Sequence, residues 1–164
     1  MAIFRRSNRV VLRPVCMSDI SSMTSYINDP AVSVNLMVYR PMAELAQREF
    51  IERISKESSG DIVVALEVEG QFIGTMGLHG IDHRHGIATT GTVLSPKYQA
   101  RGYAFEGKML FLEFAFNTLN LRKVCSNVHG FNEYSLKYAY KCGYKEEGRL
   151  RAHHYARGSY HDKV

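Results

Sequence analysis

Hydrophobic positions recur along this chain with two different periods, and the clearest change of period falls at residues 94–104. Before it, residues 87–94 (IATTGTVL) are short and β-branched, and a Ser-Pro pair follows at once, which predicts a strand that ends in a turn. After it, residues 103–119 place Phe111 and Ala115 at helical spacing, and most of the other positions are also apolar. This stretch therefore predicts a helix that is buried on nearly all sides.

The other elements follow from the same two periods and from the turn residues between them. The predicted strands cover residues 10–14, 62–68, 72–78, 122–128, 144–155 and 160–164, and the predicted helices cover residues 18–28, 42–56 and 132–141. We expect Ser18 and Asn132 to cap the first and last of these helices. Asp29-Pro30 is expected to end the first helix, and residues 80–86 to form a polar loop. The predicted order is β-α-α-β-β-β-α-β-α-β-β.

Length and composition indicate one globular domain. A chain of 164 residues is long enough for one hydrophobic core, so we predict a single domain over residues 1–164. No apolar run reaches the length of a membrane span, and the first ten residues lack the apolar centre of a secretory signal. The three cysteines form no C-x-x-C pair. We therefore expect a cytoplasmic protein with no membrane partner.

The net charge of +5 raises the question of a polyanionic partner. Lysine and arginine residues are scattered along the chain, and none of the usual nucleic-acid-binding motifs is present, so we expect no nucleic-acid partner. A polyanionic cofactor accounts for a modest positive excess equally well. The excess also needs no partner at all, because net charge informs solubility and steering rather than fold.

Five histidines invite a metal interpretation: His79, His83, His85, His153 and His154. Their spacing would reach one ion only if the loop folded back, and no thiolate or carboxylate set completes a zinc site. We predict no metal. Solvated loop histidines are the simplest alternative, and a lining role in a substrate pocket is another.

Residues 94–104 also carry candidate chemistry. The first-turn amides at a helix N-terminus have no intrahelical partner, and the helix dipole adds partial positive charge there. Gly102 would let the backbone approach a phosphate closely, and Arg101 adds a full charge. The spacing fits neither of the common nucleotide-binding loops. The stretch thus predicts an anion site, with an ordinary strand-to-helix connection as the alternative.

The loop matches the pattern [QR]-x-x-G-x-[GA], which Gln99, Gly102 and Ala104 satisfy. It resembles the pyrophosphate loop of the GNAT superfamily of N-acetyltransferases, which bind acetyl-CoA. The predicted order of elements is similar to the GNAT order over nearly the whole chain. Further matching motifs are VLRP at residues 11–14, IGxxGL at 73–78, NxxS at 132–135, KxGY at 141–144 and EGRLR at 147–151. The branch of ribosomal-protein, spermidine and flagellin-sugar acetyltransferases is the most similar.

This resemblance implies an α/β fold with a single mixed, mostly antiparallel central sheet that is splayed at the cofactor site. The chain stops at Val164, where the last strand of the family would continue. We therefore expect a last strand that is truncated or completed by a partner, and a homodimer is one such assembly.

The resemblance also assigns the cofactor contacts. The backbone of Val93 and Leu94 is expected to pair with the pantetheine arm, with one amide free to meet the thioester oxygen. The backbone amides expected to bind the pyrophosphate are those of Gln99, Ala100, Arg101, Gly102, Tyr103 and Ala104. Asn132 and Ser135 match further cofactor contacts of the family. A simple helix cap by Asn132 is compatible with that role.

The general base does not fall at the usual position. Many relatives place a glutamate two residues before the glycine of the central strand, and this chain has Thr89 there. Candidates elsewhere are His79, Asp82 and Glu67, or a chain of water molecules. We name His79 because an imidazole has the most suitable pKa. A purely structural histidine is the alternative.

The general acid is displaced as well. Many relatives place a tyrosine seven residues after the asparagine, and this chain has Ala139 there, between Tyr138 and Tyr140. Tyr138 shares a helix face with Ser135, so we name Tyr138 as the candidate acid. A core aromatic is the alternative role, and a thiolate can also leave without a dedicated acid.

The expected activity is acetyl transfer from acetyl-CoA to a primary amine by direct ternary-complex transfer, because no cysteine lies in a motif suited to a covalent intermediate. The acceptor is a small molecule or a peptide: a protein N-terminus, a polyamine, an amino sugar or an antibiotic. Asp29, Glu44 and Glu49 are candidates to attract a cationic amine, or they form a solvated face. The rival hypothesis is a non-catalytic CoA-binding sensor or scaffold, motivated by Thr89 and Ala139.

Overall fold

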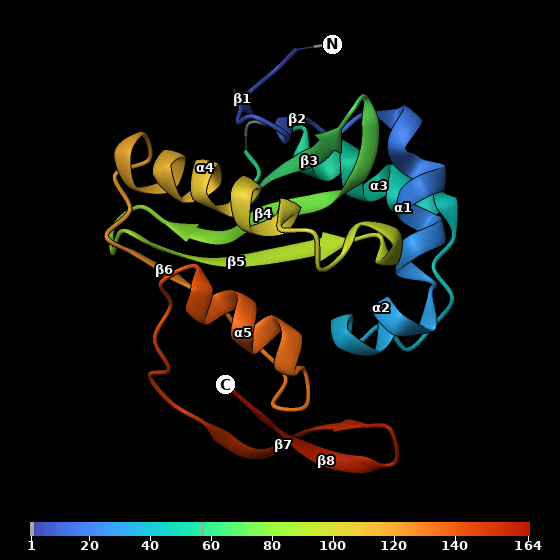
Figure 1. Ribbon diagram of the computed structural model, residues 1–164, viewed down its shortest axis with the longest axis vertical. Coiled ribbons are helices and arrows are strands. Elements are labelled where there is room, and N and C mark those ends of the chain that lie inside the picture. The colour runs from blue at the N-terminus through green and yellow to red at the C-terminus, as the bar shows by residue number, and fades with distance from the viewer. Residues whose placement is uncertain (1, 57) are drawn as a thin grey trace.

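A curled six-stranded sheet, in the order β1 to β6, forms the centre of the computed structural model, which describes residues 2–56 and 58–164 (Figure 1). Neighbouring strands run antiparallel except for β5 and β6, which are parallel. The strands of this sheet are β1 (Arg5–Arg6), β2 (Val11–Pro14), β3 (Ile62–Val68), β4 (Gln71–Asp82), β5 (Ile87–Leu94) and β6 (Lys123–Cys125). The structure confirms the predicted mixed, mostly antiparallel architecture.

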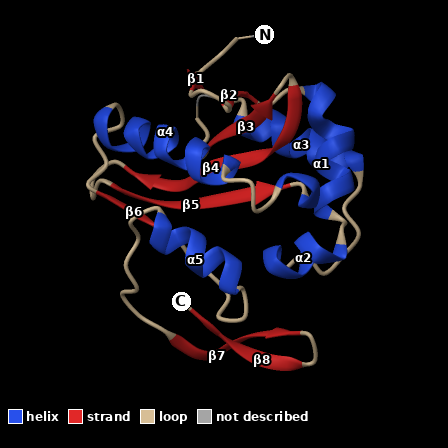
Figure 2. Ribbon diagram, viewed as in Figure 1, coloured by secondary structure: helices blue, strands red, loops and turns tan. Residues whose placement is uncertain are grey.

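Helices cover both faces of the sheet (Figure 2). The helices are α1 (Ile20–Ile27), α2 (Pro30–Leu36), α3 (Glu44–Ile54), α4 (Tyr103–Asn117) and α5 (Glu133–Lys141). On one face, Phe111 and Phe114 of α4 pack on buried strand residues such as Leu66. On the other face, Met23 of α1 and Ile51 of α3 form a second, smaller apolar cluster. None of the helices in the described part of the chain is long and apolar enough to span a membrane.

The sheet splays open between β5 and β6. Their parallel pairing runs from Ile87 to Thr89 on β5 and ends there. Beyond that point β5 continues to Leu94, paired with β4 on one side only. Helix α5 lies below this opening, and α4 lies above it (Figure 1).

The last two strands, β7 (Leu150–Ala156) and β8 (Ser159–Lys163), form a separate two-stranded sheet. Backbone bonds still tie them to the chain that follows β6. The amide of Val128 donates to the carbonyl of Val164 at 2.8 Å, and the amide of Val164 returns the bond at 2.9 Å. This hairpin therefore lies beside α5 and outside the central sheet (Figure 1).

Three predicted strands have the wrong limits. The strand predicted at 144–155 begins only at Leu150, because the Lys-Glu-Glu-Gly run before it is exposed and has no neighbouring strand to pair with. The strand predicted at 122–128 shortens to β6, since the splay removes its partner. Conversely, β4 extends through Asp82, within the loop predicted at 80–86, because Asp82 still pairs with Ile87.

The N-terminal half shows two further corrections. Asp29-Pro30 does not simply end a helix; it begins α2, because the Asp29 carboxylate accepts from the Ala31 amide at 2.8 Å and proline is well suited to the first helical turn. Ser18 does not cap the first helix. It lies inside a short 3₁₀ turn at Met17–Asp19 that precedes α1. The two-residue strand β1 was not predicted.

Candidate active site

The open edge of β5 is the first component of the site. In an antiparallel pair, alternate residues direct their backbone N–H and C=O groups toward the neighbour and the others direct them away. From Thr90 to Leu94 the outward groups face the splay, where β6 no longer pairs. An extended ligand with amide groups can add to such an edge as an extra strand does. Of the two predicted contacts, Leu94 lies on this edge, but Val93 does not. The Ser95 amide and the Val93 carbonyl both point toward β4, so Val93 directs its backbone groups away from the splay.

The loop after β5 is the second component. The Ser95 amide donates to the Ile73 carbonyl at 2.9 Å, and the Gln99 side-chain amide donates to the Leu94 carbonyl at 3.0 Å. Ala100 and Gly102 then adopt left-handed conformations, with φ of 58° and 84°. Glycine adopts this conformation without strain, which explains why a glycine suits position 102. Gln99 therefore braces the loop with its side chain, and its own amide donates to the Pro96 carbonyl at 3.2 Å.

Helix α4 begins at Tyr103, directly after this loop, with Gly102 as its N-cap. Glycine supplies no capping side chain, so the first-turn amides are left for another acceptor. The predicted pyrophosphate residues, Gln99 to Ala104, thus lie together around one exposed helix N-terminus. The helix dipole and the charge of Arg101 favour an anion there.

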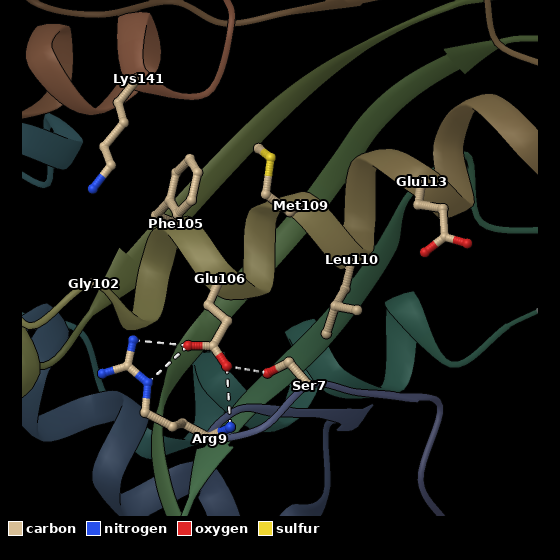
Figure 3. A pocket seen from close by; sticks show the side chains of 9 residues that line it. All are labelled: Ser7, Arg9, Gly102, Phe105, Glu106, Met109, Leu110, Glu113 and Lys141. Carbon is tan, nitrogen blue, oxygen red and sulfur yellow. Dashed lines mark hydrogen bonds and ion pairs between the residues drawn. The ribbon is translucent and has the colours of Figure 1, made fainter.

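An ion pair fastens the N-terminal segment to this end of α4. The Arg9 guanidinium meets the Glu106 carboxylate at 2.8 Å, and Ser7 also donates to Glu106 (Figure 3). A side chain added at Gly102 would lie 3.4 Å from the Arg9 guanidinium, so this cation stands beside the loop. The hydrogen bond from Ser7 and the contacts from Arg9 hold the pKa of Glu106 below its usual value, although burial opposes them. Sequence reasoning missed Arg9 because it lies 92 positions before Arg101, whose carbonyl it approaches.

A cavity of about 470 Å³ opens between this ion pair and the outer face of α4. It is lined by Ser7, Arg9, Gly102, Phe105, Glu106, Met109, Leu110, Glu113 and Lys141 (Figure 3). The cavity touches the anion loop at Gly102. It lies on the other side of α4 from the sheet, so it is separate from the open edge of β5.

Tyr138 of α5 reaches the splay. Its hydroxyl donates to the Ala104 carbonyl at 3.2 Å and lies 3.4 Å from the Thr92 hydroxyl. The predicted acid therefore stands between α4 and the open part of β5. Burial raises the pKa of Tyr138, so its hydroxyl keeps its proton at neutral pH. Tyr140 points elsewhere and donates to Glu146 at the surface.

Asn132 and Ser135 lie at the N-terminus of α5. The Asn132 side-chain oxygen accepts from the Ser135 amide at 3.1 Å, so Asn132 is the helix cap that the sequence predicts. Both residues are partly exposed.

His79 lies in β4, three residues before the end of the strand, opposite Thr89 of β5. Its Nδ1 is 3.4 Å from the Asp61 carboxylate, and its side chain is 42% exposed. A side chain on Gly77 would come within 2.5 Å of the His79 Nε2, so this glycine leaves room for the ring. Burial raises the pKa of Asp61, but hydrogen bonds from Arg53, the Gly80 amide and His79 outweigh it and keep the pKa low. Asp61 therefore stays ionised and can orient the imidazole.

The two other candidate bases are engaged elsewhere. Glu67 accepts from the Arg13 guanidinium at 2.7 Å, and the same guanidinium binds Asp19 at 2.8 Å. Asp82 accepts from the His85 amide at 2.8 Å and closes the turn before β5. These carboxylates hold the fold together, which leaves His79 and water as the candidate bases.

Lys108 was not singled out by sequence reasoning. It lies on the core-facing side of α4 and is only 2% exposed. Its ammonium donates to the Thr90 hydroxyl, at the start of the open edge of β5. The signal was present in the sequence, because Lys108 is a charged residue three positions before Phe111 in an otherwise apolar helical pattern.

The remaining histidines do not assemble into a metal site. Within residues 2–56 and 58–164, no three His, Cys, Asp or Glu side chains lie close enough together to hold a metal ion. His153 and His154 are in edge contact on β7, at 4.7 Å between ring centroids. His83 and His85 belong to the turn before β5. Of the acidic candidates for the acceptor, Asp29 caps α2, and Glu44 and Glu49 are exposed on α3.

Comparison with known proteins gives a family match over most of the chain. A domain model described as an acetyltransferase (GNAT) domain matches residues 9–145. The chain is 27% identical over 157 residues to an uncharacterized N-acetyltransferase, p20, of Bacillus licheniformis, covering 93% of this chain and 88% of that relative. It is 28% identical over 160 residues to spermidine N(1)-acetyltransferase of Escherichia coli K12, covering 96% of this chain and 84% of that relative.

Solved structures show the same fold. A spermidine N-acetyltransferase from Vibrio cholerae, in complex with CoA and spermine, superimposes with a TM-score of 0.86 at 21% identity, over 96% of this chain and 93% of that one. A microcin C7 self-immunity acetyltransferase, in complex with acetyl-CoA and AMP, gives a TM-score of 0.81 at 17% identity, over 96% of this chain and 90% of that one.

Proposed function

This chain belongs to the GNAT family of N-acetyltransferases, and on that premise we propose that it transfers the acetyl group of acetyl-CoA directly to a primary amine while both substrates are bound. One observation carries the proposal: the open edge of β5 leads straight into the exposed, uncapped N-terminus of α4. The first component suits an amide-containing arm, and the second suits a pyrophosphate.

The described residues fit acetyl-CoA in this position. Leu94 offers its backbone amide to the pantetheine arm, and the amides from Ala100 to Ala104 surround the proposed pyrophosphate site. The Gln99 amide donates to the Pro96 carbonyl, so Gln99 contributes by bracing the loop. Arg9 and Arg101 add positive charge beside Gly102. Asn132 and Ser135 lie at the start of α5 and complete the proposed set. Acetyl-CoA supplies an activated acetyl group. The protein would orient that group and supply one side chain that accepts a proton and one that donates a proton.

His79 and Tyr138 are the proposed acid–base residues, and they lie on opposite faces of the sheet. Leu78 and Ala88 face α4, so alternation along the strands directs His79 to the other face. The acceptor amine therefore enters from the His79 side and gives up its proton to His79, directly or through water. Tyr138, on the side of α4 and α5, is placed to protonate the departing sulfur.

The acceptor class is proposed from the relatives. Two of the similar proteins are named as spermidine acetyltransferases, and one structure holds spermine. A polyamine carries primary alkyl amino groups, and only about a thousandth of such groups are neutral at pH 7. Transfer to a polyamine therefore needs a base, which is the role proposed for His79. We therefore place polyamines first among the acceptors, before protein N-termini, amino sugars and aminoglycoside antibiotics.

The test is acetyl-CoA-dependent release of free thiol with spermidine, an amino sugar nucleotide, an aminoglycoside and short peptides with free N-termini. Gly102→Asp places a negative charge at the proposed pyrophosphate site and should abolish release. Gly70→Asp is the matched control, since Gly70 has φ of 73° in open space at the β3–β4 turn. In the same assay, His79→Gln should lower kcat while His83→Gln should not.

The outcomes separate the alternatives. Release with one amine that Gly102→Asp abolishes and Gly70→Asp preserves would support the transferase and identify its acceptor class. Thermal stabilisation by CoA without release for any amine would favour the CoA-binding sensor or scaffold. Failure of CoA to stabilise the parent protein would overturn the proposed cofactor site.

A further inference from the structure

A buried cation lies beneath the open edge of β5. Lys108 projects from α4 into the protein interior with 2% of its surface exposed, and its ammonium donates to the Thr90 hydroxyl. Among the described residues, no carboxylate forms an ion pair with it. The charge is therefore held by a neutral hydroxyl and by the ring of Tyr138, whose centroid is 6.0 Å from the ammonium.

Such a cation is unfavourable for folding. Moving an ammonium from water into the interior costs several kcal/mol unless a counter-charge accompanies it, and an apolar residue of similar volume is often more stable there. Burial accordingly lowers the pKa of Lys108 to about 8. The lysine remains mostly charged at pH 7. A buried charge without a resident partner, beside a proposed active site, indicates a transient partner.

The location of Lys108 identifies that partner. Thr89 is the last β5 residue that pairs with β6, and Thr90 is the next one. Lys108 therefore binds the strand at the apex of the splay. If the pantetheine arm lies along the open edge of β5 from Leu94 toward Thr90, its sulfur end points toward this apex. The Tyr138 hydroxyl also lies there, 3.4 Å from the Thr92 hydroxyl.

We propose that Lys108 is the counter-charge for the CoA thiolate, and that it stabilises the negative charge that forms on sulfur as the thioester breaks. This inference rests on the proposed function. The amine nitrogen forms a bond to the acetyl carbon, the carbon–sulfur bond breaks, and its electron pair stays on sulfur until Tyr138 supplies a proton. The amine proton passes to His79 or water. Thr90 holds the Lys108 ammonium in place, and its charge acts on the sulfur electrostatically through a poorly solvated part of the interior. Lys108 does not touch the reacting atoms, so it is a positioning residue.

The other titratable groups around Lys108 are neutral. These are Tyr138 of α5, Cys142 at the C-terminal cap of this helix and Tyr144 just beyond it. Burial raises the pKa of all three, although Lys108 partly opposes this for Cys142. None of these described groups competes as an anion at neutral pH. The ammonium is thus available for a sulfur anion from the cofactor.

The experiment measures the proton released when CoA binds, by calorimetry at pH 7 in two buffers of different ionisation enthalpy. An ordinary thiol with a pKa of about 8.5 stays protonated. If the parent protein lowers the pKa of the bound thiol by about one unit or more, roughly a fifth of a proton or more is released. Desulfo-CoA carries the same phosphates without the sulfur, so its proton release is the baseline.

Two variants test the residue. Lys108→Met removes the charge in a similar volume and should eliminate the excess release with CoA, while its melting temperature stays equal or rises. Thr90→Val keeps the lysine but removes its hydrogen-bond acceptor, and it should reduce the excess. Lys137→Met is the control, because this lysine is exposed on α5, where its side chain is 77% accessible. With a working acceptor, kcat of Lys108→Met should fall by at least about tenfold.

The outcomes are distinct. Equal proton release for CoA and desulfo-CoA in the parent, or an excess that persists in Lys108→Met, would overturn the role of Lys108 and leave the proposed function intact. No binding of CoA by the parent would overturn both. A loss of melting temperature in Lys108→Met would show that the lysine is a structural element and contradict the argument from burial.

Discussion

Tyr138 and Tyr140 differ by two positions and have opposite environments. The Tyr138 hydroxyl reaches the interior between α4 and β5, and burial raises its pKa. Tyr140 is 47% exposed, and its hydroxyl donates to the surface carboxylate of Glu146. Two positions on a helix differ by about 200° in direction, so only one of the two tyrosines can face the splay.

Replacing Tyr138 by phenylalanine should lower kcat by about 10²-fold, because the departing thiolate loses its proton donor. The apparent KM for acetyl-CoA should change little, since the ring and its packing remain. Because its pKa is raised, the tyrosine should stay protonated, so parent activity should show no loss from its ionisation up to about pH 10. Steady-state kinetics across pH measures both.

Tyr140→Phe provides the control in the same helix and should retain the kcat of the parent. Equal activity of the two variants would contradict the proposed acid role. The thiolate would then leave unaided.

Among the secondary-structure elements, the sequence predicts the limits of a strand well where β-branched residues fill the strand and turn residues flank it. The strands at 62–68 and 87–94 match β3 and β5 because β-branched runs and turn residues mark both ends. Asp29-Pro30 was misinterpreted, because the same pair both ends a helix and starts one. The limits of β6 and β7 depend on partner strands that lie far away in sequence.

The candidate site likewise contains parts that are predictable from the sequence and parts that are not. The loop from Gln99 to Ala104 could be predicted because its residues are contiguous. The Asp61–His79 contact and the burial of Lys108 could not, since both arise only when distant segments pack together. A single sequence carries no direct signal for such contacts.

The start of α2 gives a prediction at this scale. Asp29→Ala removes the side chain that accepts from the Ala31 amide, and it should lower the free energy of unfolding by about 1 kcal/mol. Asp29→Asn retains a capping oxygen and should lie within a few tenths of the parent. Chemical denaturation measures both. Equal losses for the two variants would show that the charge, rather than the cap, stabilises α2.

At the scale of the whole molecule, a group of histidines connects the C-terminal hairpin to the chain after β6. His129 and His154 are in edge contact, at 4.6 Å between ring centroids, and Lys163 and His161 lie nearby. Burial, followed by these positive neighbours, lowers the pKa of His129. Burial, followed by His153 and Lys163, lowers that of His154.

The lowered pKa values of His129 and His154 determine how the stability of the protein depends on pH. A histidine with a lowered pKa in the folded protein binds its proton more readily when unfolded, so stability falls as pH drops below about 6.5. The melting temperature should therefore decrease between pH 7 and pH 5.5, above the range in which ordinary carboxylates titrate. His129→Gln should weaken this dependence. A parent melting temperature that is flat or rising over this range would contradict the assignment.

The gap between β5 and β6 has a consequence for the protein before it meets a ligand. An unpaired strand edge is a template for association with other chains, and proteins normally cover or interrupt such edges. Helix α5 contacts this part of β5 where the Tyr138 hydroxyl lies 3.4 Å from the Thr92 hydroxyl. A bound pantetheine arm would occupy the same backbone groups. If acetyl-CoA is the cosubstrate, as proposed, its binding would cover this edge and protect it from association with other chains, so the protein would stay monodisperse more readily when acetyl-CoA is present.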